Sequence, residues 1–494
     1  MLVKIIYLLL LTAWAKEYDK AFDLLFTSNV KEFDEITVHF QKPLPTWLLN
    51  KKLIRIGAGC FGMGDRKFHH VFDGFGKMHI WNLKPNRTTF SAKFVRTRTF
   101  VDSEKRNTVS PLYTLFDDTV PRQSLIDRLR SLFNGPDNVN VNIVKFGDDY
   151  LAISDFWSKY VIDIDRGETL FRTSPDFLHR SIISRRIPLL SSSHPIQGVN
   201  IVTEINPFGL NYVHLVQIKS AREVVNLLSI PVDEAPYIHS FSLTSNYAII
   251  VANPVSISIS KLFETLNPSK SIIWRENGES DVYVVDLRTL QYRKYRTEGK
   301  FMLHHVNAFE YNDAIIFDTT TYKSFTLIHD YQLDTLRNST VRNKITDLPS
   351  LKRYTIDLKS GIVKHKLLSN RRPYQGLEMP VINELYRFKS YCFIYGISFK
   401  SDNIQFSNVT LIKVDICGKG RDRIWELNGH IPSEPWFVHH PNRRAEDDGL
   451  LFSVISDGIR LRSYLAVFNA TTLTLVNTSP TPTLVPMMFH GYHE

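Results

Sequence analysis

The stretch Val282-Tyr-Val-Val-Asp286 contains the pattern that decides the fold, an apolar run that ends in an aspartate before a short polar turn. Valine and tyrosine favour strands. An aspartate can accept backbone N–H groups two residues further on, which suits a hairpin tip. Other copies of the pattern are Tyr160-Val-Ile-Asp163, Tyr354-Thr-Ile-Asp357, Leu411-Ile-Lys-Val-Asp415 and Val467-Phe-Asn469. The pattern predicts repeated hairpins.

The remaining sequence also favours an all-β fold, because short runs of Val, Ile, Tyr, Phe and Thr are broken by Gly, Asn, Asp and Pro. The hairpin copies do not recur at one fixed period, which indicates irregular repeats with inserted loops. A β-propeller, in which four-stranded sheets are arranged radially, would leave few exposed edges, but the pattern does not count its blades. Residues Gln123 to Phe133 and Ser256 to Leu266 are the predicted helical inserts, either a lid on the sheets or a membrane-inserting segment.

The composition predicts a folded chain with a large core, since 43% of its residues are hydrophobic and 22% are charged. No linker rich in Pro, Gly and Ser divides residues 16–494, so we expect a single domain. The net charge of +10 is scattered along the chain. This scatter argues against nucleic-acid binding and favours mild attraction to anionic membrane surfaces.

The first fifteen residues are predicted to be a secretory signal peptide. Lys4 precedes an apolar run from Ile5 to Leu11, and Ala13-Trp-Ala15 has the form of a cleavage site. The alternative is an uncleaved N-terminal anchor. No stretch of the chain beyond residue 15 is long and apolar enough for a transmembrane helix.

Glycosylation sequons and cysteines also bear on whether the chain enters the secretory pathway. Glycan acceptor sequons occur at Asn86, Asn338, Asn408, Asn469 and Asn477. The three cysteines, Cys60, Cys392 and Cys417, are too few and too widely spaced for a disulfide framework or a cysteine zinc site, so we expect buried thiols.

Short segments spread along the chain carry a resemblance to one family. They are Arg55-Ile-Gly57-Ala-Gly59, Phe72-Asp-Gly74, Phe146-Gly-Asp148-Asp, Ser193-His194-Pro195, His239-Ser-Phe241, His304-His305-Val-Asn307, Glu378-Met-Pro380, Pro432-Ser-Glu434-Pro435, Glu446-Asp-Asp-Gly449 and Phe489-His490-Gly491. In this order they resemble the motifs of the carotenoid oxygenase family, which also contains the retinoid isomerohydrolase of the retinal pigment epithelium. The resemblance spans roughly Pro43 to His490.

This resemblance implies a seven-bladed β-propeller with a helical cap and one Fe(II) ion per chain on its axis. The implied iron ligands are His194, His239, His304 and His490. In a strand, neighbouring side chains point to opposite faces, so only one residue of the His304-His305 pair can ligate, and the motif favours His304.

Carboxylates that support the ligands are implied at Glu378, Glu434 and Asp155. The family usually has glutamate at the last position. The shorter aspartate side chain reaches about 1.5 Å less far, which predicts a backbone shift or a bridging water there. The family's membrane-bound animal members have a cysteine where this chain has Pro136-Asp137-Asn138-Val139, so a lipid-anchoring site is missing.

The implied reaction is the Fe(II)- and O2-dependent cleavage of a carotenoid or apocarotenoid double bond, giving carbonyl products such as retinal. The alternatives are a retinyl-ester isomerohydrolase, a non-catalytic carotenoid-binding propeller and a protein-interaction scaffold without iron. The sequence designates no substrate-contact residue. A secretory location follows from the leader, whereas animal relatives are largely cytosolic or membrane-associated.

Overall fold

The aspartate and asparagine turns close hairpins as predicted. The computed structural model describes residues 17–85, 87–111, 114–178, 189–206, 209–369, 374–400 and 406–494, so the leader and Asn86 lie outside the described residues. The Oδ1 atom of Asp286 accepts the N–H groups of Arg288 and Thr289 at 2.9 and 3.0 Å. The equivalent bonds form at Asp163, Asp357, Asp415 and Asn469.

These hairpins belong to seven antiparallel sheets of four or five strands within the described residues. We number the sheets one to seven in chain order, and the strand bounds follow from the innermost strand outward. The first is β36 (Met488–His493), β2 (Lys51–Cys60), β5 (Phe75–Leu83), β6 (Thr88–Phe94) and β1 (Phe33–Val38). The second is β8 (Asn142–Phe146), β9 (Asp149–Ile153), β10 (Lys159–Asp163) and β11 (Glu168–Thr173). The third is β12 (Leu190–Ser191), β13 (Val199–Glu204), β14 (Asn211–Ile218) and β15 (Val224–Val232).

The other four sheets repeat this order. The fourth is β17 (Ser242–Leu243), β18 (Tyr247–Ala252), β21 (Ser280–Asp286) and β22 (Tyr292–Thr297). The fifth is β23 (Phe301–Tyr311), β24 (Ala314–Tyr322), β25 (Ser350–Asp357) and β26 (Val363–Leu367). The sixth is β27 (Tyr374–Val381), β28 (Phe393–Lys400), β29 (Val409–Asp415) and β30 (Arg423–Trp425). The seventh is β31 (His430–Pro432), β33 (Gly449–Asp457), β34 (Arg462–Asn469) and β35 (Leu475–Pro480), with β32 (Trp436–His439) also on β33.

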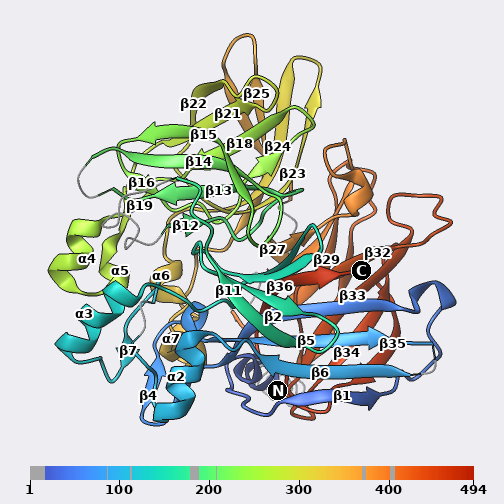
Figure 1. Ribbon diagram of the computed structural model, residues 1–494. Coiled ribbons are helices and arrows are strands. Elements are labelled where there is room, and N and C mark those ends of the chain that lie inside the picture. Colours follow the sequence, from blue (N-terminus) through green and yellow to red (C-terminus); the bar gives the residue numbers. More distant parts are fainter. Residues whose placement is uncertain are drawn as a thin grey trace, which may run out of the picture.

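The ring closes through the first sheet, which contains strands from both ends of the chain. The C-terminal strand β36 pairs with β2, with Arg55 opposite Gly491. The N-terminal strand β1 adds to the outer edge beside β6. The molecule is thus an all-β, seven-bladed propeller, as the family resemblance implies (Figure 1).

Helices and two small sheets cap one side of the propeller (Figure 1). Both predicted inserts are helical, as α3 (Leu125–Asn134) and α4 (Ile259–Thr265). The remaining helices are α2 (Arg98–Arg106), α5 (Pro268–Ser271), α6 (Leu327–Asp330), α7 (Leu333–Arg337), α8 (Ser339–Arg342), η1 (Thr46–Leu48), η2 (Val71–Asp73), η4 (Glu384–Tyr386) and the helical residues 17–25. The small sheets are β3 (Gly62–Met63), β4 (Arg66–Phe68) and β7 (Thr119–Val120), and β16 (Ala235–Pro236), β19 (Val255–Ile257) and β20 (Ile272–Trp274).

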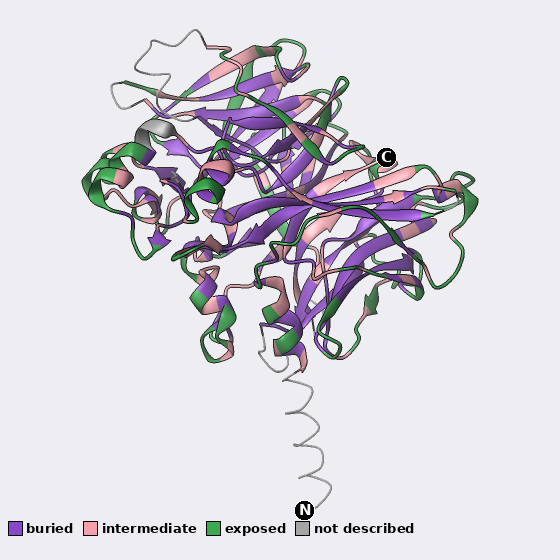
Figure 2. Ribbon diagram, turned by 60° about the horizontal axis from the view of Figure 1, so that its bottom comes forward, coloured by how far each residue is buried: buried purple, intermediate pink, exposed green. Residues whose placement is uncertain are grey.

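Apolar side chains between neighbouring sheets form the core, and exposed residues concentrate in loops and cap helices (Figure 2). The expectation of three buried thiols is right for Cys60 but wrong for the other two, because Cys392 and Cys417 form a disulfide. Cys392 precedes β28 and Cys417 follows β29, and these two strands pair antiparallel. In the part of the chain that the structure describes, no helix is long and apolar enough to cross a membrane.

Candidate metal centre

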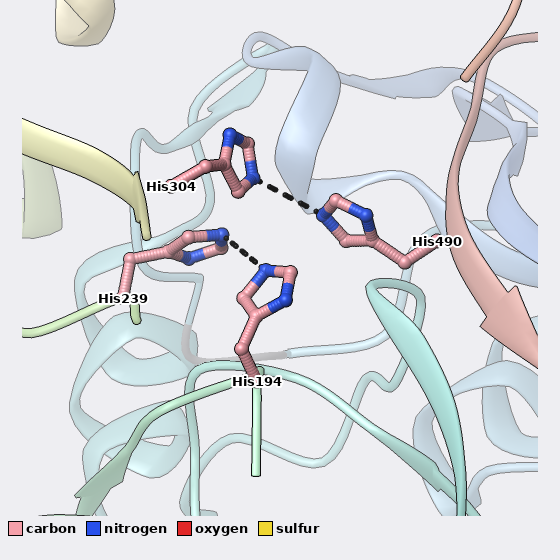
Figure 3. Close-up of side chains that lie close together, drawn as sticks. All are labelled: His194, His239, His304 and His490. Atoms are coloured by element: carbon pink, nitrogen blue, oxygen red, sulfur yellow. Dashed lines mark hydrogen bonds between the residues drawn. The ribbon is translucent and has the colours of Figure 1, made fainter. Parts of the chain in front are cut away.

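Four histidines that belong to four different sheets or their connecting loops lie close together, with their rings turned toward one another (Figure 3). His194 lies in the loop between β12 and β13, and His239 lies between β16 and β17. His304 is in the innermost strand β23, and His490 is in the innermost strand β36. Because the inner ends of all the sheets face the axis, residues far apart in the sequence meet there.

The four imidazoles are arranged as a set of metal ligands would be. One ring nitrogen from each lies within 4.8 Å of the other three. The Nε2 atoms of His194 and His239 are 3.1 Å apart, and those of His304 and His490 are 3.2 Å apart. Neutral imidazole nitrogens suit iron, zinc, copper or nickel, so this donor set can hold a transition-metal ion.

Strand alternation separates His304 from its neighbour. The His304 ring points toward the other three rings, whereas the Nδ1 atom of His305 is 2.7 Å from the Ser242 hydroxyl. The His305 ring also stacks on Phe317, with the two ring centroids 5.7 Å apart. The structure therefore brings His304 to the axis and directs His305 into the sheet.

A carboxylate lies behind three of the four imidazoles. The Nδ1 atom of His239 is 2.9 Å from Asp155, that of His304 is 2.5 Å from Glu378, and that of His490 is 2.8 Å from Glu434. Each carboxylate accepts the Nδ1 proton and thus fixes the tautomer that leaves the Nε2 lone pair free for a metal. All three carboxylates proposed from the sequence reach a histidine.

Asp155 reaches His239 directly, which fits the first of the two expected alternatives, a backbone shift, and leaves no need for a bridging water. Its side chain is also a hydrogen-bond acceptor for the Ser193 hydroxyl at 2.5 Å and the Tyr237 hydroxyl at 2.9 Å. The backbone on which Asp155 lies is therefore close enough to His239 to offset the missing methylene. Neither Ser193 nor Tyr237 was singled out from the sequence as a supporting residue.

Burial and neighbouring charges set the protonation of these groups. Burial, reinforced by the other three histidines, holds the pKa of His194 well below its usual value. Burial also holds the pKa of His490 well below its usual value. Burial alone would raise the pKa of Asp155 and Glu378, but hydrogen bonds and the nearby histidines lower both. Two ligand candidates are thus neutral and two of the carboxylates ionised near neutral pH.

Glu434 differs from the other two carboxylates. Burial raises its pKa, and the adjacent Arg55 guanidinium only partly opposes that rise. Arg55 was quoted from the sequence only as part of a motif, without a role. The sequence signal is an arginine inside the apolar run Leu53-Ile-Arg-Ile56, because a charge in a buried strand needs a partner, although the run does not say which partner.

Two cavities of different character meet at the histidines. The first is lined mainly by apolar and aromatic side chains from the cap and from propeller strands, and includes His239, His304 and His490. The second is lined by many polar and charged residues and includes His194, His304 and His490. His304 and His490 thus lie between an apolar chamber on the cap side and a polar vestibule.

Comparisons with known proteins agree with this architecture. Residues 26–494 match the family model described as retinal pigment epithelial membrane protein. The chain is 26% identical to the β,β-carotene 15,15'-dioxygenase of Gallus gallus, covering 88% of this chain and 90% of that protein. It is also 26% identical to the mitochondrial carotenoid-cleaving dioxygenase of Macaca fascicularis, covering 90% of each.

Solved structures show the same fold. Cobalt-substituted apocarotenoid oxygenase of Synechocystis aligns with a TM-score of 0.81 at 22% identity, covering 97% of this chain and 98% of that chain. The family match spans nearly the whole chain, including all four histidines and the three carboxylates. The chain therefore belongs to the retinal pigment epithelial membrane protein family, the carotenoid oxygenase family that its motifs resemble.

Proposed function

We propose that this protein is a non-haem iron dioxygenase that cleaves one double bond of a carotenoid or apocarotenoid with O2. Both oxygen atoms add across the bond, which breaks, and two carbonyl products such as retinal leave. The observation that carries the proposal is the cluster of four imidazoles at the wall of an apolar chamber. The relatives named as carotenoid-cleaving dioxygenases support the same reaction.

The residues fit an Fe(II) ion. His194, His239, His304 and His490 offer four neutral nitrogens, a donor set that binds Fe(II), and the carboxylates behind three of them raise their basicity. Bound Fe(II) with four protein ligands supplies open coordination positions at which O2 can be activated.

The apolar chamber suits a polyene. Phe72, Phe116, Tyr237, Leu303 and Phe325 are among the side chains that line it. A hydrocarbon substrate needs no general acid, so these residues bind it by apolar contact, exclude water and select which double bond lies beside His304.

Membrane contact is proposed at the cap, because the substrate is soluble in lipid. Leu125 and Ile126 of α3 are 57% and 63% exposed, and Phe263 of α4 is 56% exposed. The Arg122 side chain links the two segments by donating to the Thr265 carbonyl at 3.2 Å. Exposed apolar side chains beside cationic ones suit the surface of an anionic bilayer.

A secretory location is also proposed. Disulfides such as Cys392–Cys417 persist in oxidising compartments, which agrees with the predicted leader. Asn338 is exposed, whereas Asn477 is buried and its side-chain amide donates to the Lys42 carbonyl at 2.7 Å. We expect a glycan at Asn338 and none at Asn477. Mass spectrometry of the chain expressed with and without residues 1–15 tests this, and an unmodified Asn338 in the full chain would argue against the secretory route.

The deciding experiment for the reaction is anaerobic purification with metal analysis, followed by addition of O2 and β-carotene in detergent and identification of the products. We expect one iron per chain and aldehydes that disappear in H304A. The matched control is H305Q, which alters the neighbouring histidine that points away from the axis and should keep the iron. Iron without carotenoid cleavage would favour a retinyl-ester isomerohydrolase or a carotenoid carrier. A purified chain without iron would refute the proposed metal centre.

A further inference from the structure

Arg55 lies behind the metal centre in β2, and its side chain is completely buried. Its Nη1 atom donates to the Oε2 atom of Glu434 in an ion pair. Its Nη2 atom donates to the backbone carbonyl of Phe489 at 2.6 Å. One guanidinium therefore joins a carboxylate of the seventh sheet to the backbone of β36 in the first.

Both partners of Arg55 lead to the same imidazole. The other oxygen of Glu434 accepts the Nδ1 proton of His490 at 2.8 Å, and Phe489 directly precedes His490 in the chain. Arg55 thus restrains the ring of His490 through the carboxylate and its backbone through the carbonyl. The guanidinium also lies over the Trp436 ring, with its carbon 4.6 Å from the ring centroid.

The other two carboxylates are held differently. Asp155 accepts hydrogen bonds from the hydroxyls of Ser193 and Tyr237. Glu378 accepts from the Thr320 hydroxyl at 3.0 Å and from its neighbour's backbone N–H. These donors are neutral. Glu434 differs, because its donor is the positively charged guanidinium of Arg55.

This difference has a structural consequence. Glu434 has a charged donor, whereas the donors to Asp155 and Glu378 named above are neutral. Removing one partner of a buried ion pair is costly, so replacing Arg55 should disturb Glu434 and the His490 imidazole that it holds.

We propose that Arg55 is a positioning residue for the metal centre, which holds Glu434 and the Phe489 carbonyl together and thereby aims the Nε2 atom of His490 at the metal. The inference rests on the proposed metal centre. It assigns no contact between Arg55 and the substrate or the ion.

The test measures Co²⁺ binding to the chelator-treated full chain, by competition with a chelator and by the visible absorption of the bound ion. We expect Co²⁺ affinity to fall about 10- to 100-fold in R55M, the usual effect of losing a group that orients a ligand, with a changed absorption band. R55K keeps the charge but cannot bridge two acceptors as a planar fork does, so it should fall between R55M and the wild type. The matched control is R353M, which removes a part-buried bidentate pair with Asp318 that contacts none of the four histidines and should leave Co²⁺ affinity unchanged.

A double variant protects the test against misfolding. R55M leaves the buried Glu434 carboxyl without its guanidinium partner, whereas R55M/E434Q removes both partners of the ion pair. If Arg55 acts mainly through Glu434, adding R55M to E434Q should cost far less affinity than adding R55M to the wild type. An R55M chain that folds and keeps wild-type Co²⁺ affinity and absorption would overturn the inference, as would an equal loss in both backgrounds. If the wild type binds Co²⁺ but cleaves no carotenoid, only the proposed reaction fails; if it binds no Co²⁺, both fail.

Discussion

Restoring glutamate at position 155, the family's usual residue there, should weaken the metal centre. Asp155 already lies 2.9 Å from the Nδ1 atom of His239, and hydrogen bonds of this type span about 2.7–3.2 Å. An added methylene extends the side chain by about 1.5 Å. Because the residue is only 5% exposed, the longer side chain must either bend back from the imidazole or displace it.

The magnitude follows from the bond at risk. A hydrogen bond to a charged group contributes about 1.5–3 kcal/mol, and about 1.4 kcal/mol corresponds to a tenfold change in an equilibrium constant. Losing the bond between His239 and the carboxylate in D155E should therefore reduce metal affinity by roughly 10- to 100-fold. The hydroxyls of Ser193 and Tyr237 would also lose their acceptor geometry, which favours the upper end of that range.

Co²⁺ titration of the chelator-treated chain against a competing chelator measures this change. D318E is the matched control, because Asp318 is also a buried aspartate, bound by Arg353 and the Tyr391 hydroxyl in a position that lines neither cavity. D318E should lower the free energy of unfolding and leave Co²⁺ affinity unchanged. A D155E chain that binds Co²⁺ as tightly as the wild type would refute the reasoning that the backbone here is fitted to aspartate.

Three further changes have defined outcomes. Serine at both Cys392 and Cys417 should lower the free energy of unfolding by about 3.5 kcal/mol, the chain-entropy value for a sequence separation of 25 residues. Urea denaturation with and without reductant checks this, and a reductant-insensitive wild type would contradict it. Burial lowers the pKa of His70 to about 4. Between about pH 6.5 and pH 4 this imidazole is therefore protonated in the unfolded chain but neutral in the folded chain. Stability should fall by about 2 kcal/mol from this group between pH 7.5 and 5, and the fall should be smaller in H70Q. L303W should fill the apolar chamber beside His304, keep Co²⁺ binding and abolish the spectral shift of added carotenoid; unchanged product formation would exclude that chamber as the substrate site.

Much of the fold could be predicted because each hairpin is a local structure. The five strand–turn copies found in the sequence close the third-to-fourth strand hairpin in five of the seven sheets. A sixth hairpin, in the third sheet, uses the same chemistry with a different residue, since the Ser220 hydroxyl accepts the N–H groups of Arg222 and Glu223. A pattern restricted to Asp and Asn therefore misses it.

The disulfide was missed because it depends on a pairing that the sequence does not state. Cys392 and Cys417 are 25 residues apart, which alone indicates nothing. They flank two strands that pair antiparallel, with Phe393 opposite Asp415, so this pairing brings the residue before Phe393 close to the residues after Asp415. Arg55 was missed for the same reason, because its partners Glu434 and Phe489 are brought to it only by the closure of the ring.

The metal centre and the closure of the ring depend on each other, because both are built from contacts between sheets and not from local sequence patterns. Each supporting carboxylate comes from a different sheet than the histidine that it contacts. In the sequence, Asp155 precedes its partner His239, Glu378 follows its partner His304, and Glu434 precedes its partner His490. The last pair joins the seventh sheet to the first, where β36 completes the ring. A metal held by all four histidines would therefore cross-link the third, fourth and fifth sheets to the first, in which the ring closes. Because a ligand stabilises the state that binds it, metal binding and ring closure must reinforce one another.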